Sequence, residues 1–321
     1  MNFFFYKDIS ATSSFGKKIL LLFSFFCFLV NAQEIKFKSI GVDEGLSINF
    51  VQCILQDKNG FMWFGTQDGL NRYDGYQVSV YRNKNDDQNS ISNNSINCLF
   101  EDKNGNIVIG TNDGGLDIFN PQNNSFRHFD HNPKKKSLSN NTVKCITQDK
   151  QGLIWAGTEH GLNSINSVTG EVTNYFHEDS NPFSLPDNRV FSLSQTENGT
   201  IWIGTFNKGL CNLDPVSGKF KSFPVPEKFT VDHNSSLNEY RHRIYSLYIV
   251  ENSTIYVGTD GGLGVFNSQT QTWENFVLFG DPNAENVTLL NRIWGIDEDS
   301  QGALWIASYG GGLIRYQKNG G

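Results

Sequence analysis

The chain contains few prolines, few charged residues and no pair of cysteines at metal-ligand spacing. Only 8 of its 321 residues are Pro and 18% are charged, whereas Gly (31 residues) and aromatic residues (13%) are abundant. This composition is typical of neither a helical nor a disordered protein, and it favours a β fold. The 5 cysteines include no Cys-x-x-Cys, so no zinc or redox centre is indicated.

The short motifs of common catalytic sites are also missing. There is no Gly-Lys-Ser/Thr phosphate loop, no Gly-x-Ser-x-Gly and no His-Glu-x-x-His. His128 and His131 have no third ligand at a metal spacing. The acidic residues that recur at one turn position are expected to form turns rather than an acid/base pair; they are Asp57, Asp102, Asp149 and Asp299. We therefore expect no cofactor, no metal and no catalytic residue.

Residues 1–32 have the pattern of a signal peptide. Lys17 and Lys18 precede a short apolar run, Ile19–Val30, and Val30-Asn31-Ala32 offers small residues for cleavage before Gln33. We predict a periplasmic protein, since no later run is long and apolar enough to span a bilayer. The formal charge of −7 becomes about −9 without residues 1–32, which argues against nucleic acid as a partner.

A unit of three predicted strands recurs six times across residues 33–321. In its first copy, Val51–Tyr73, apolar runs are separated by Asp57-Lys58-Asn59-Gly60 and Gln67-Asp68-Gly69, whose Asn-Gly and Asp-Gly steps are typical of hairpin turns. The small residue that ends the second strand recurs every 45 to 54 residues, at Gly65, Gly110, Gly157, Gly204, Gly258 and Ala307. A period of this length indicates an array of equal β units.

A fourth strand is predicted after the triplet in five of the units. These segments are Tyr76–Tyr81, Ser125–Phe129, Glu171–Phe176, Lys219–Phe223 and Thr272–Phe279. Four antiparallel strands in each period favour an all-β fold, a β-propeller with six visible blades. Residues 35–40 are a candidate closing strand for the last blade, because Lys36-Phe37-Lys38-Ser39 repeats Lys219-Phe220-Lys221-Ser222. The ring is then a closed six-bladed one; the alternative is an incomplete part of a seven-bladed ring.

Two repeated positions are predicted to serve packing. Trp63, Trp155, Trp202 and Trp305 occupy one place in four units, which indicates a core role rather than a ligand site. Cys53, Cys98 and Cys145 share a position that holds Ser192, Ser246 and Gly295 in the later units. A position that accepts Cys, Ser and Gly is expected to need a small side chain and not a disulfide.

The repeat resembles the two-component regulator propeller family. Its pattern, Val-x-x-Ile-x-x-Asp-x-x-Gly-x-x-Trp-x-Gly-Thr-x-x-Gly-Leu-x-x-Tyr-Asp, is seen at Val51–Asp74, and Val143–Asn166 is similar. The resemblance implies the exported sensor region of a hybrid histidine kinase, a region associated with detecting oligosaccharides. No kinase segment is present in residues 1–321. The expected partners are an oligosaccharide or other small ligand, a C-terminal sensor and kinase portion or a second propeller, and a second copy in a homodimer.

Candidate ligand contacts lie on the propeller face that carries the second-to-third-strand turns and the links between blades, because that face varies most among the repeats. The turn residues proposed as contacts are Asp68, Asp113, His160, Phe206, Asp260 and Tyr309. Near the channel mouth, Arg189, Arg243 and Arg292 could receive an acidic sugar or a carboxylate. A neighbouring set is expected to bond turn backbones instead: Asn49, Asn94, Asn141, Asn188, His242 and Asn291. The alternative function is a standalone secreted lectin or polysaccharide lyase or hydrolase.

Overall fold

The computed structural model describes residues 38–226, 242–250, 253–280 and 290–317. The chain divides into two units, Met1–Ile40 and Gly41–Gly321, which are treated separately. Of the first unit, residues 38–40 form neither helix nor strand. The predicted signal peptide lies outside the described residues, as do residues 35–37 of the predicted closing strand. Both segments therefore stay predictions.

The second unit consists of six antiparallel sheets preceded by the short helix η2 (Val42–Glu44). Blades 1 and 2 contain β1 (Val51–Gln56), β2 (Met62–Thr66), β3 (Gly69–Tyr73), β4 (Val78–Tyr81), β5 (Ile96–Glu101), β6 (Ile107–Thr111), β7 (Leu116–Asn120) and β8 (Ser125–Phe129). Blades 3 and 4 contain β9 (Val143–Gln148), β10 (Ile154–Thr158), β11 (Gly161–Ile165), β12 (Val172–Tyr175), β13 (Val190–Gln195), β14 (Ile201–Thr205), β15 (Leu210–Asp214) and β16 (Lys219–Phe223). Blades 5 and 6 contain β17 (Ile244–Val250), β18 (Thr254–Thr259), β19 (Gly262–Asn267), β20 (Thr272–Val277), β21 (Ile293–Glu298), β22 (Leu304–Ser308) and β23 (Gly312–Tyr316).

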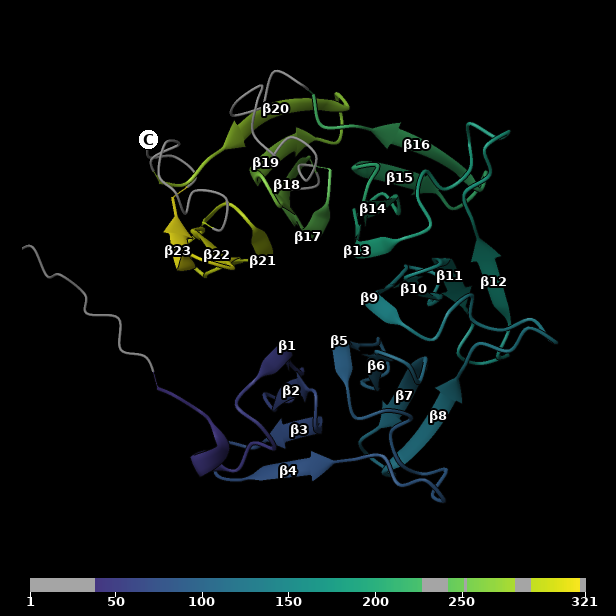
Figure 1. Cartoon of the computed structure of the whole chain (residues 1–321), viewed down its shortest axis with the longest axis vertical. Helices are drawn as coiled ribbons and strands as arrows, with labels where there is room; N and C mark the ends of the chain where they lie inside the picture. Colours follow the sequence, from purple (N-terminus) through teal and green to yellow (C-terminus); the bar gives the residue numbers. More distant parts are fainter. Residues whose placement is uncertain (1–37, 227–241, 251–252, 281–289, 318–321) are drawn as a thin grey trace, which may run out of the picture. The chain divides into compact units, whose positions relative to one another are not determined.

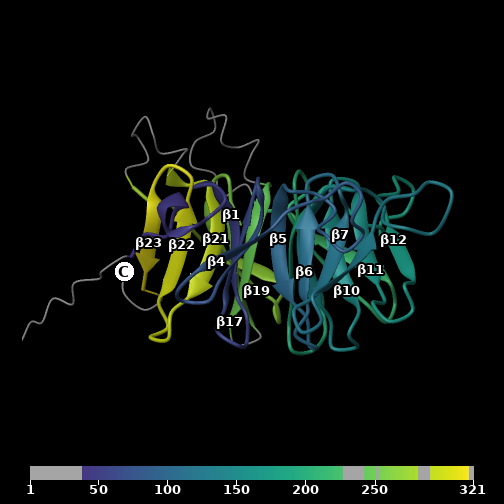
Figure 2. The ribbon, with the colours of Figure 1, turned by 90° about the horizontal axis from the view of Figure 1, so that it is seen from below.

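The sheets are arranged as a six-bladed β-propeller, which confirms the predicted fold class. Within Gly41–Gly321 they follow one another around a common axis, with the first strand of each sheet innermost (Figure 1). Each innermost strand contacts that of the next blade, from β1 through β5, β9, β13 and β17 to β21. Seen from the side, the strands run between two faces that carry the turns (Figure 2). The described part of blade 6 has three strands, whereas blades 1–5 have the four strands predicted.

A buried aspartate organises the turn between the first two strands of a blade. In blade 1, Asp57 Oδ1 accepts hydrogen bonds from the backbone N–H groups of Asn59 (2.9 Å) and Phe61 (3.0 Å). Asp57 Oδ2 accepts the indole N–H of Trp63 at 2.8 Å. The same aspartate–indole bond recurs between Asp149 and Trp155 and between Asp299 and Trp305. These contacts confirm the turn-forming role of the repeated aspartates.

Blade 4 carries the tryptophan without its aspartate. Trp202 is 2% exposed, and its indole nitrogen has no hydrogen-bond partner among the described residues. Thr196 stands where blades 1, 2, 3 and 6 have Asp. Its hydroxyl bonds Asn198 and the Thr200 carbonyl within the turn. An unpaired buried donor is costly because it has lost water without a replacement. The Trp202 indole is therefore a place where an added acceptor could stabilise blade 4.

Blades pack on one another across a glycine in the second strand. A Cβ added at Gly110 would lie 2.4 Å from Cys98 Sγ and 2.8 Å from Val143 Cγ1 of the next blade. Blade 6 reverses the pair, with Gly295 opposite Ala307. This confirms that Cys98 and its counterparts were correctly predicted as small residues; the four cysteines described are all free. Burial raises the pKa of the Cys145 thiol, which makes it unreactive.

His128 belongs to an ion pair that ties the outer strand of blade 2 to the strand beside it. Its Nδ1 lies 2.7 Å from Oδ1 of the fully buried Asp117, and its Nε2 lies 2.8 Å from the Gln88 carbonyl. Asp117 Oδ2 also accepts hydrogen bonds from the backbone N–H and hydroxyl of Ser92. The bond to Asp117 is the main cause that raises the pKa of His128 from 6.5 to about 9.

We predict that Thr196→Asp stabilises the protein by about 1–2 kcal/mol, because the new carboxylate can accept the Trp202 indole N–H. The measurement is the free energy of unfolding in urea. The reciprocal control, Asp57→Thr, removes the acceptor from Trp63 and should destabilise the chain by a similar amount. An unchanged or lowered stability of Thr196→Asp would contradict this account of the turn.

We predict that Gly110→Ala costs about 1–3 kcal/mol of stability, because its methyl group overlaps atoms of two blades. Adding Cys98→Gly, which reproduces the arrangement of blade 6, should recover part of this loss. A double-mutant cycle measured by urea unfolding gives the coupling between the two positions. Strict additivity of the two single changes would show that the residues do not share one packing space.

The His128 ion pair predicts a dependence of stability on pH. Its pKa is raised in the folded state, so the stabilisation is complete below about pH 6.5 and is lost as the pH rises through about 9. His128→Gln should remove a fall of about 1–2 kcal/mol in unfolding free energy between pH 6 and pH 10. The control His160→Gln should retain the fall. If His128→Gln also retains it, the ion pair is not its source.

Candidate functional site

Every innermost strand contains an irregularity at its second residue. The pairing of β1 with β2 skips from Val51 to Cys53, and the same skip occurs in the other five blades. Such β-bulges re-aim a side chain and are frequent beside functional sites. The skipped residues are Gln52, Asn97, Lys144, Phe191, Tyr245 and Trp294. The bulge position thus places one variable side chain per blade beside the propeller axis.

Aromatic side chains at the bulges of blades 4–6 contact one another in series. The rings of Phe191 and Tyr245 are edge to face with centroids 5.9 Å apart. Tyr245 and Trp294 are stacked at 5.5 Å. Two turn residues extend the series: Phe206 lies 5.0 Å from Phe191, and Tyr309 stacks on Trp294 at 5.8 Å. We call these five residues the aromatic arc.

The bulge residues of blades 1–3 are polar. Gln52 and Asn97 carry amides, and the Lys144 ammonium lies 5.8 Å from the Phe191 ring and 3.3 Å from Glu159. One half of the channel mouth is therefore aromatic and the other half offers hydrogen-bond donors and acceptors. Combined apolar and convergent polar groups are characteristic of small-molecule sites.

Three arginines predicted from the sequence lie against the aromatic arc. The guanidinium carbons of Arg189 and Arg243 lie 3.8 and 4.3 Å from the centroid of the same Phe206 ring. That of Arg292 lies 5.3 Å from the Tyr309 centroid. Each arginine precedes the bulge residue of its own blade by two positions, so the fold brings Arg189, Arg243, Arg292, Phe206 and Tyr309 together as one cluster.

Asp260 lies beneath this cluster and is only 2% exposed. Its Oδ1 lies 2.8 Å from Arg292 Nε, and its Oδ2 lies 3.5 Å from Arg243 Nη1. The Tyr245 hydroxyl donates to Oδ2 at 3.3 Å. Burial raises the pKa of Asp260, while the two guanidinium groups act in the opposite direction. The structure therefore gives Asp260 a positioning role beneath the arc.

The remaining predicted contacts lie apart from the arc. Asp68 forms a two-point ion pair with Arg82, 2.8 Å at its shorter contact, and the arginine lowers the pKa of this carboxyl. Asp113 is exposed. His160 is exposed and lies 5.6 Å from the Phe176 ring. Among the described residues, the structure does not bring these three side chains together with the aromatic arc.

The repeated asparagines bond backbone groups, as predicted. The side-chain oxygens of four of them accept backbone N–H groups at 2.6–2.8 Å; they are Asn94, Asn141, Asn188 and Asn291. Asn49 accepts the N–H of Val42 at 2.8 Å. The backbone carbonyl of His242 accepts the N–H of Gly209 at 3.2 Å. These interactions are structural and fix the links between blades.

Sequence reasoning missed Phe191, Tyr245 and Trp294. They stand in predicted strands, where aromatic residues are ordinary. The available signal was the contrast among repeats, since the same position reads Gln, Asn, Lys, Phe, Tyr and Trp from blade 1 to blade 6. This position varies among the blades, whereas the residue before it is always Val or Ile and the residue after it is always small. Such variation suggests recognition, as it does in the turns.

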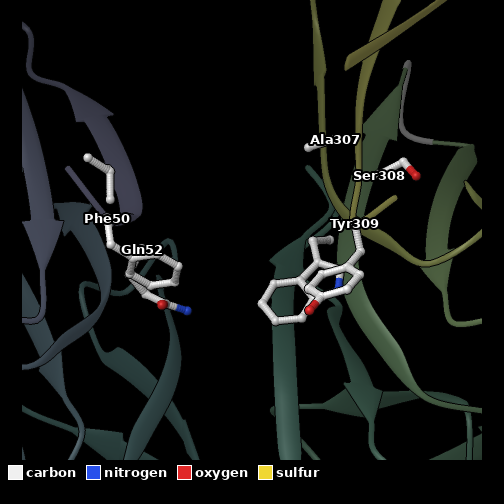
Figure 3. Close-up of a pocket in the computed structure, with 7 residues that line it drawn as sticks. Phe50, Gln52, Ala307, Ser308 and Tyr309 are labelled. Carbon is white, nitrogen blue, oxygen red and sulfur yellow. The ribbon is translucent and has the colours of Figure 1, made fainter. Parts of the chain in front are cut away.

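The aromatic arc ends at a cavity of about 260 Å³ between blades 1 and 6. Phe50 and Gln52 line one wall, and Ala307, Ser308 and Tyr309 line the other (Figure 3). Trp294 and Val51 complete the lining. The volume is close to the lower end of small-molecule pockets, about 300 Å³, so the arc leads into a space that could hold part of a small ligand.

Two kinds of site are absent from the residues that the structure describes. In them, no group of three or more His, Cys, Asp or Glu side chains is arranged to hold a metal ion. In the same ranges, no helix combines the length and the apolar character that a membrane span requires.

Comparison with known proteins relates the chain to bacterial sensors. The sequence matches the family described as two component regulator propeller at residues 45–68, 90–113, 137–160 and 184–207. A 75-residue stretch, 23% of the chain, is 45% identical to Histidine kinase P4 of Formosa agariphila and spans 6% of that protein. The extracellular domain of a putative hybrid two component system from B. thetaiotaomicron is 28% identical with a TM-score of 0.64. That alignment covers 86% of this chain and 41% of the domain.

An enzyme shares the fold at lower identity. Virginiamycin B lyase from Staphylococcus aureus is 14% identical with a TM-score of 0.60, covering 83% of this chain and 79% of the lyase. Identity at this level shows the propeller fold alone. Each of the four matched segments begins in the link before a blade and contains the first two strands of that blade, in blades 1–4. Four segments of the chain thus match the two-component regulator propeller repeat.

Proposed function

We propose that the chain is the exported ligand-sensing propeller of a two-component regulatory system and that it recognises oligosaccharides at the aromatic arc. The observation that carries the proposal is the series of five aromatic rings at the channel mouth, joined through Phe191, Tyr245 and Trp294. The similarity to the extracellular domain of a putative hybrid two component system supports the regulatory role and the location outside the cytoplasm.

The two halves of the channel mouth suit the two kinds of surface on a sugar. The C–H faces of a pyranose are apolar and pack on aromatic rings, which bury a large area in a rigid geometry. The hydroxyl edges need hydrogen-bond partners, and Gln52, Asn97 and Lys144 supply them on the opposite side. A flexible oligosaccharide is favoured over a single compact metabolite because the rings extend across three blades.

Binding in such a site can serve as a signal because it crosses blade boundaries. Phe191, Tyr245 and Trp294 come from three different blades, and the cavity beside Trp294 has walls from blades 1 and 6. A ligand that contacts several blades at once favours one relative arrangement of them, which shifts a pre-existing equilibrium. The proposed partners that would receive this change are a sensor and kinase portion, a second propeller, and a second copy of the chain in a homodimer.

A standalone lectin or polysaccharide lyase or hydrolase is the alternative. Product analysis separates it from the sensor, since turnover of the saccharide would favour the enzyme. A lectin would bind without belonging to a larger chain, which the reading frame after residue 321 would reveal.

We predict that Trp294→Ala weakens oligosaccharide binding about tenfold or more, because it removes the central stacking surface of the arc. The measurement is titration calorimetry of the exported chain against a panel of neutral and acidic oligosaccharides, with product analysis of each sample. Tyr76→Ala is the matched control, since Tyr76 is a 96% exposed aromatic in an outer turn of blade 1. Binding that is unaffected by Trp294→Ala would place the ligand elsewhere.

A further inference from the structure

A second cavity lies on the outer part of blade 4. Its volume is about 590 Å³, which is within the range of about 300–1,000 Å³ that is usual for small-molecule sites. Much of its wall comes from β16, the outermost strand of blade 4 (Figure 1), and from the adjacent strand β15. None of the described residues that line it belongs to the aromatic arc. We call it the outer cavity, and six of its residues carry side chains suited to binding: Phe183, Asn212, Asp214, Lys219, Lys221 and Gln271.

Blade 4 differs from blades 1 and 6 at the strand position that faces its tryptophan. In blades 1 and 6 the residues paired with the tryptophan are Arg72 and Arg315. Their guanidinium carbons lie 5.7 and 5.9 Å from the centroids of the indole rings. In blade 4 the partner of Trp202 is Asn212, which lines the outer cavity. A short amide thus replaces a long cationic side chain, and it offers the cavity both a donor and an acceptor.

Gln271 holds a strained backbone conformation at the outer cavity. The residue before the fourth strand has a positive φ in blades 2, 4 and 5, where it is Asn124 (54°), Gly218 (68°) and Gln271 (57°). Gly and Asn adopt this conformation readily, whereas other residues rarely do. Such strain is often found at ligand sites. The Gln271 side-chain oxygen accepts a hydrogen bond from the Lys221 ammonium, so a turn of blade 5 is tied to the outer cavity of blade 4.

An exposed aromatic ring borders the outer cavity. Phe183 lies in the link before blade 4 and is 54% exposed. Its carbonyl accepts the N–H of Phe220 at 2.9 Å, which fastens the link to β16. The Lys219 ammonium lies 5.1 Å from the centroid of the Phe183 ring. The ring is thus held in place while much of its surface stays open to solvent, and the apolar face of a sugar can pack on such a ring.

The charged groups of the outer cavity are of both signs. Among the described residues that line it, the charged ones are Lys219, Lys221 and Asp214, and Asp214 is paired in register with Lys219 on the adjacent strand. Asp214 also accepts hydrogen bonds from the Ser217 hydroxyl (2.7 Å) and the Val216 N–H (3.0 Å), which lower the pKa of this carboxyl. A carboxylate beside two ammonium groups opposes the binding of an anion. Uncharged hydroxyl groups suit both, because they donate as well as accept.

We propose that the outer cavity is a second saccharide site, which binds an uncharged sugar unit independently of the aromatic arc. The apolar face of the sugar stacks on Phe183, and its hydroxyl groups donate to Asp214 and accept from the two lysine ammonium groups. Gln271 is a positioning residue, since it acts through Lys221. This site goes beyond the proposed function because it gives the chain two separate contacts with saccharides, and it shares with that function only the class of ligand.

The test measures saccharide binding with each site disabled in turn. The probes are the neutral oligosaccharides cellohexaose, xylohexaose and mannohexaose, titrated into the exported chain and its variants by calorimetry. Trp294→Ala disables the arc, and we expect it to retain binding of at least one probe at the outer cavity. Adding Phe183→Ala should weaken this residual binding about tenfold or more. Adding Tyr76→Ala instead is the matched control, since Tyr76 is an exposed aromatic outside both sites, and it should leave the residual binding unchanged.

Gln271→Gly separates binding from folding. It places at this turn the residue that blade 4 uses, so the free energy of unfolding in urea should not fall. In the Trp294→Ala background it should nevertheless weaken the residual binding about threefold or more, because Lys221 loses its partner. Gln271→Asn keeps an amide and tolerates the positive φ, so it should restore part of the affinity. Equal residual affinity in all three chains would overturn the role of Gln271.

The other outcomes have separate meanings. If Trp294→Ala loses all saccharide binding, the outer site is overturned and the proposed function stands. Residual binding that Phe183→Ala leaves unchanged would also overturn the outer site, because the sugar would then lie elsewhere. Binding of inorganic phosphate in place of every neutral probe would show an anion site instead. If Phe183→Ala abolishes all binding and Trp294→Ala none, the outer site stands and recognition at the arc is wrong. If no probe binds, the outer site is wrong.

Discussion

The close approach of one blade to the next is the constraint on which this propeller depends. Near the end of the second strand of blades 1–5, the backbone of one sheet meets a β-branched side chain of the next sheet, and there is room for only one small side chain. Cys98 with Gly110 and Ser192 with Gly204 satisfy the constraint in one way. Gly295 with Ala307 satisfies it in the other. Interiors packed at this density resist even one added methyl group, so the spacing of the blades is set by these positions.

That spacing also determines what can be built at the axis. The innermost strands lie close enough for side chains of adjacent blades to touch, and the bulge at the second residue removes one residue per blade from the pairing ladder. In blades 4–6 this residue is aromatic and the rings meet in series; the arginine two positions earlier then lies against the same rings. Asp260 supplies the buried counter-charge that lets Arg243 and Arg292 approach each other. Packing between blades thus brings the arc and its charges together.

The fold could be predicted from the sequence because the repeat occurs in six copies. Three repeated features all indicate a propeller: Gly65 and its counterparts, the turn aspartates and the four-strand period. Because each of them recurs from unit to unit, each could be interpreted as structural.

The site could be predicted only in part. Arg189, Arg243, Arg292, Phe206 and Tyr309 were found through variation in turns and links, whereas Tyr245 and Trp294 were hidden inside strands. Their role depends on a bulge and on contacts between blades, and neither is encoded in the local pattern of one repeat. Asp260 was recognised as a site residue, but its burial depends on tertiary packing.

The bulge has a consequence for how such a protein can change over time. A residue that is skipped by the strand pairing contributes little to the register of its sheet, so its replacement leaves the blade and its neighbours in place. Six such positions surround one axis, and each belongs to a separate repeat. Substitutions at these positions can therefore accumulate one blade at a time. Relatives with the same scaffold can acquire different ligand preferences without any variant along the way losing its fold.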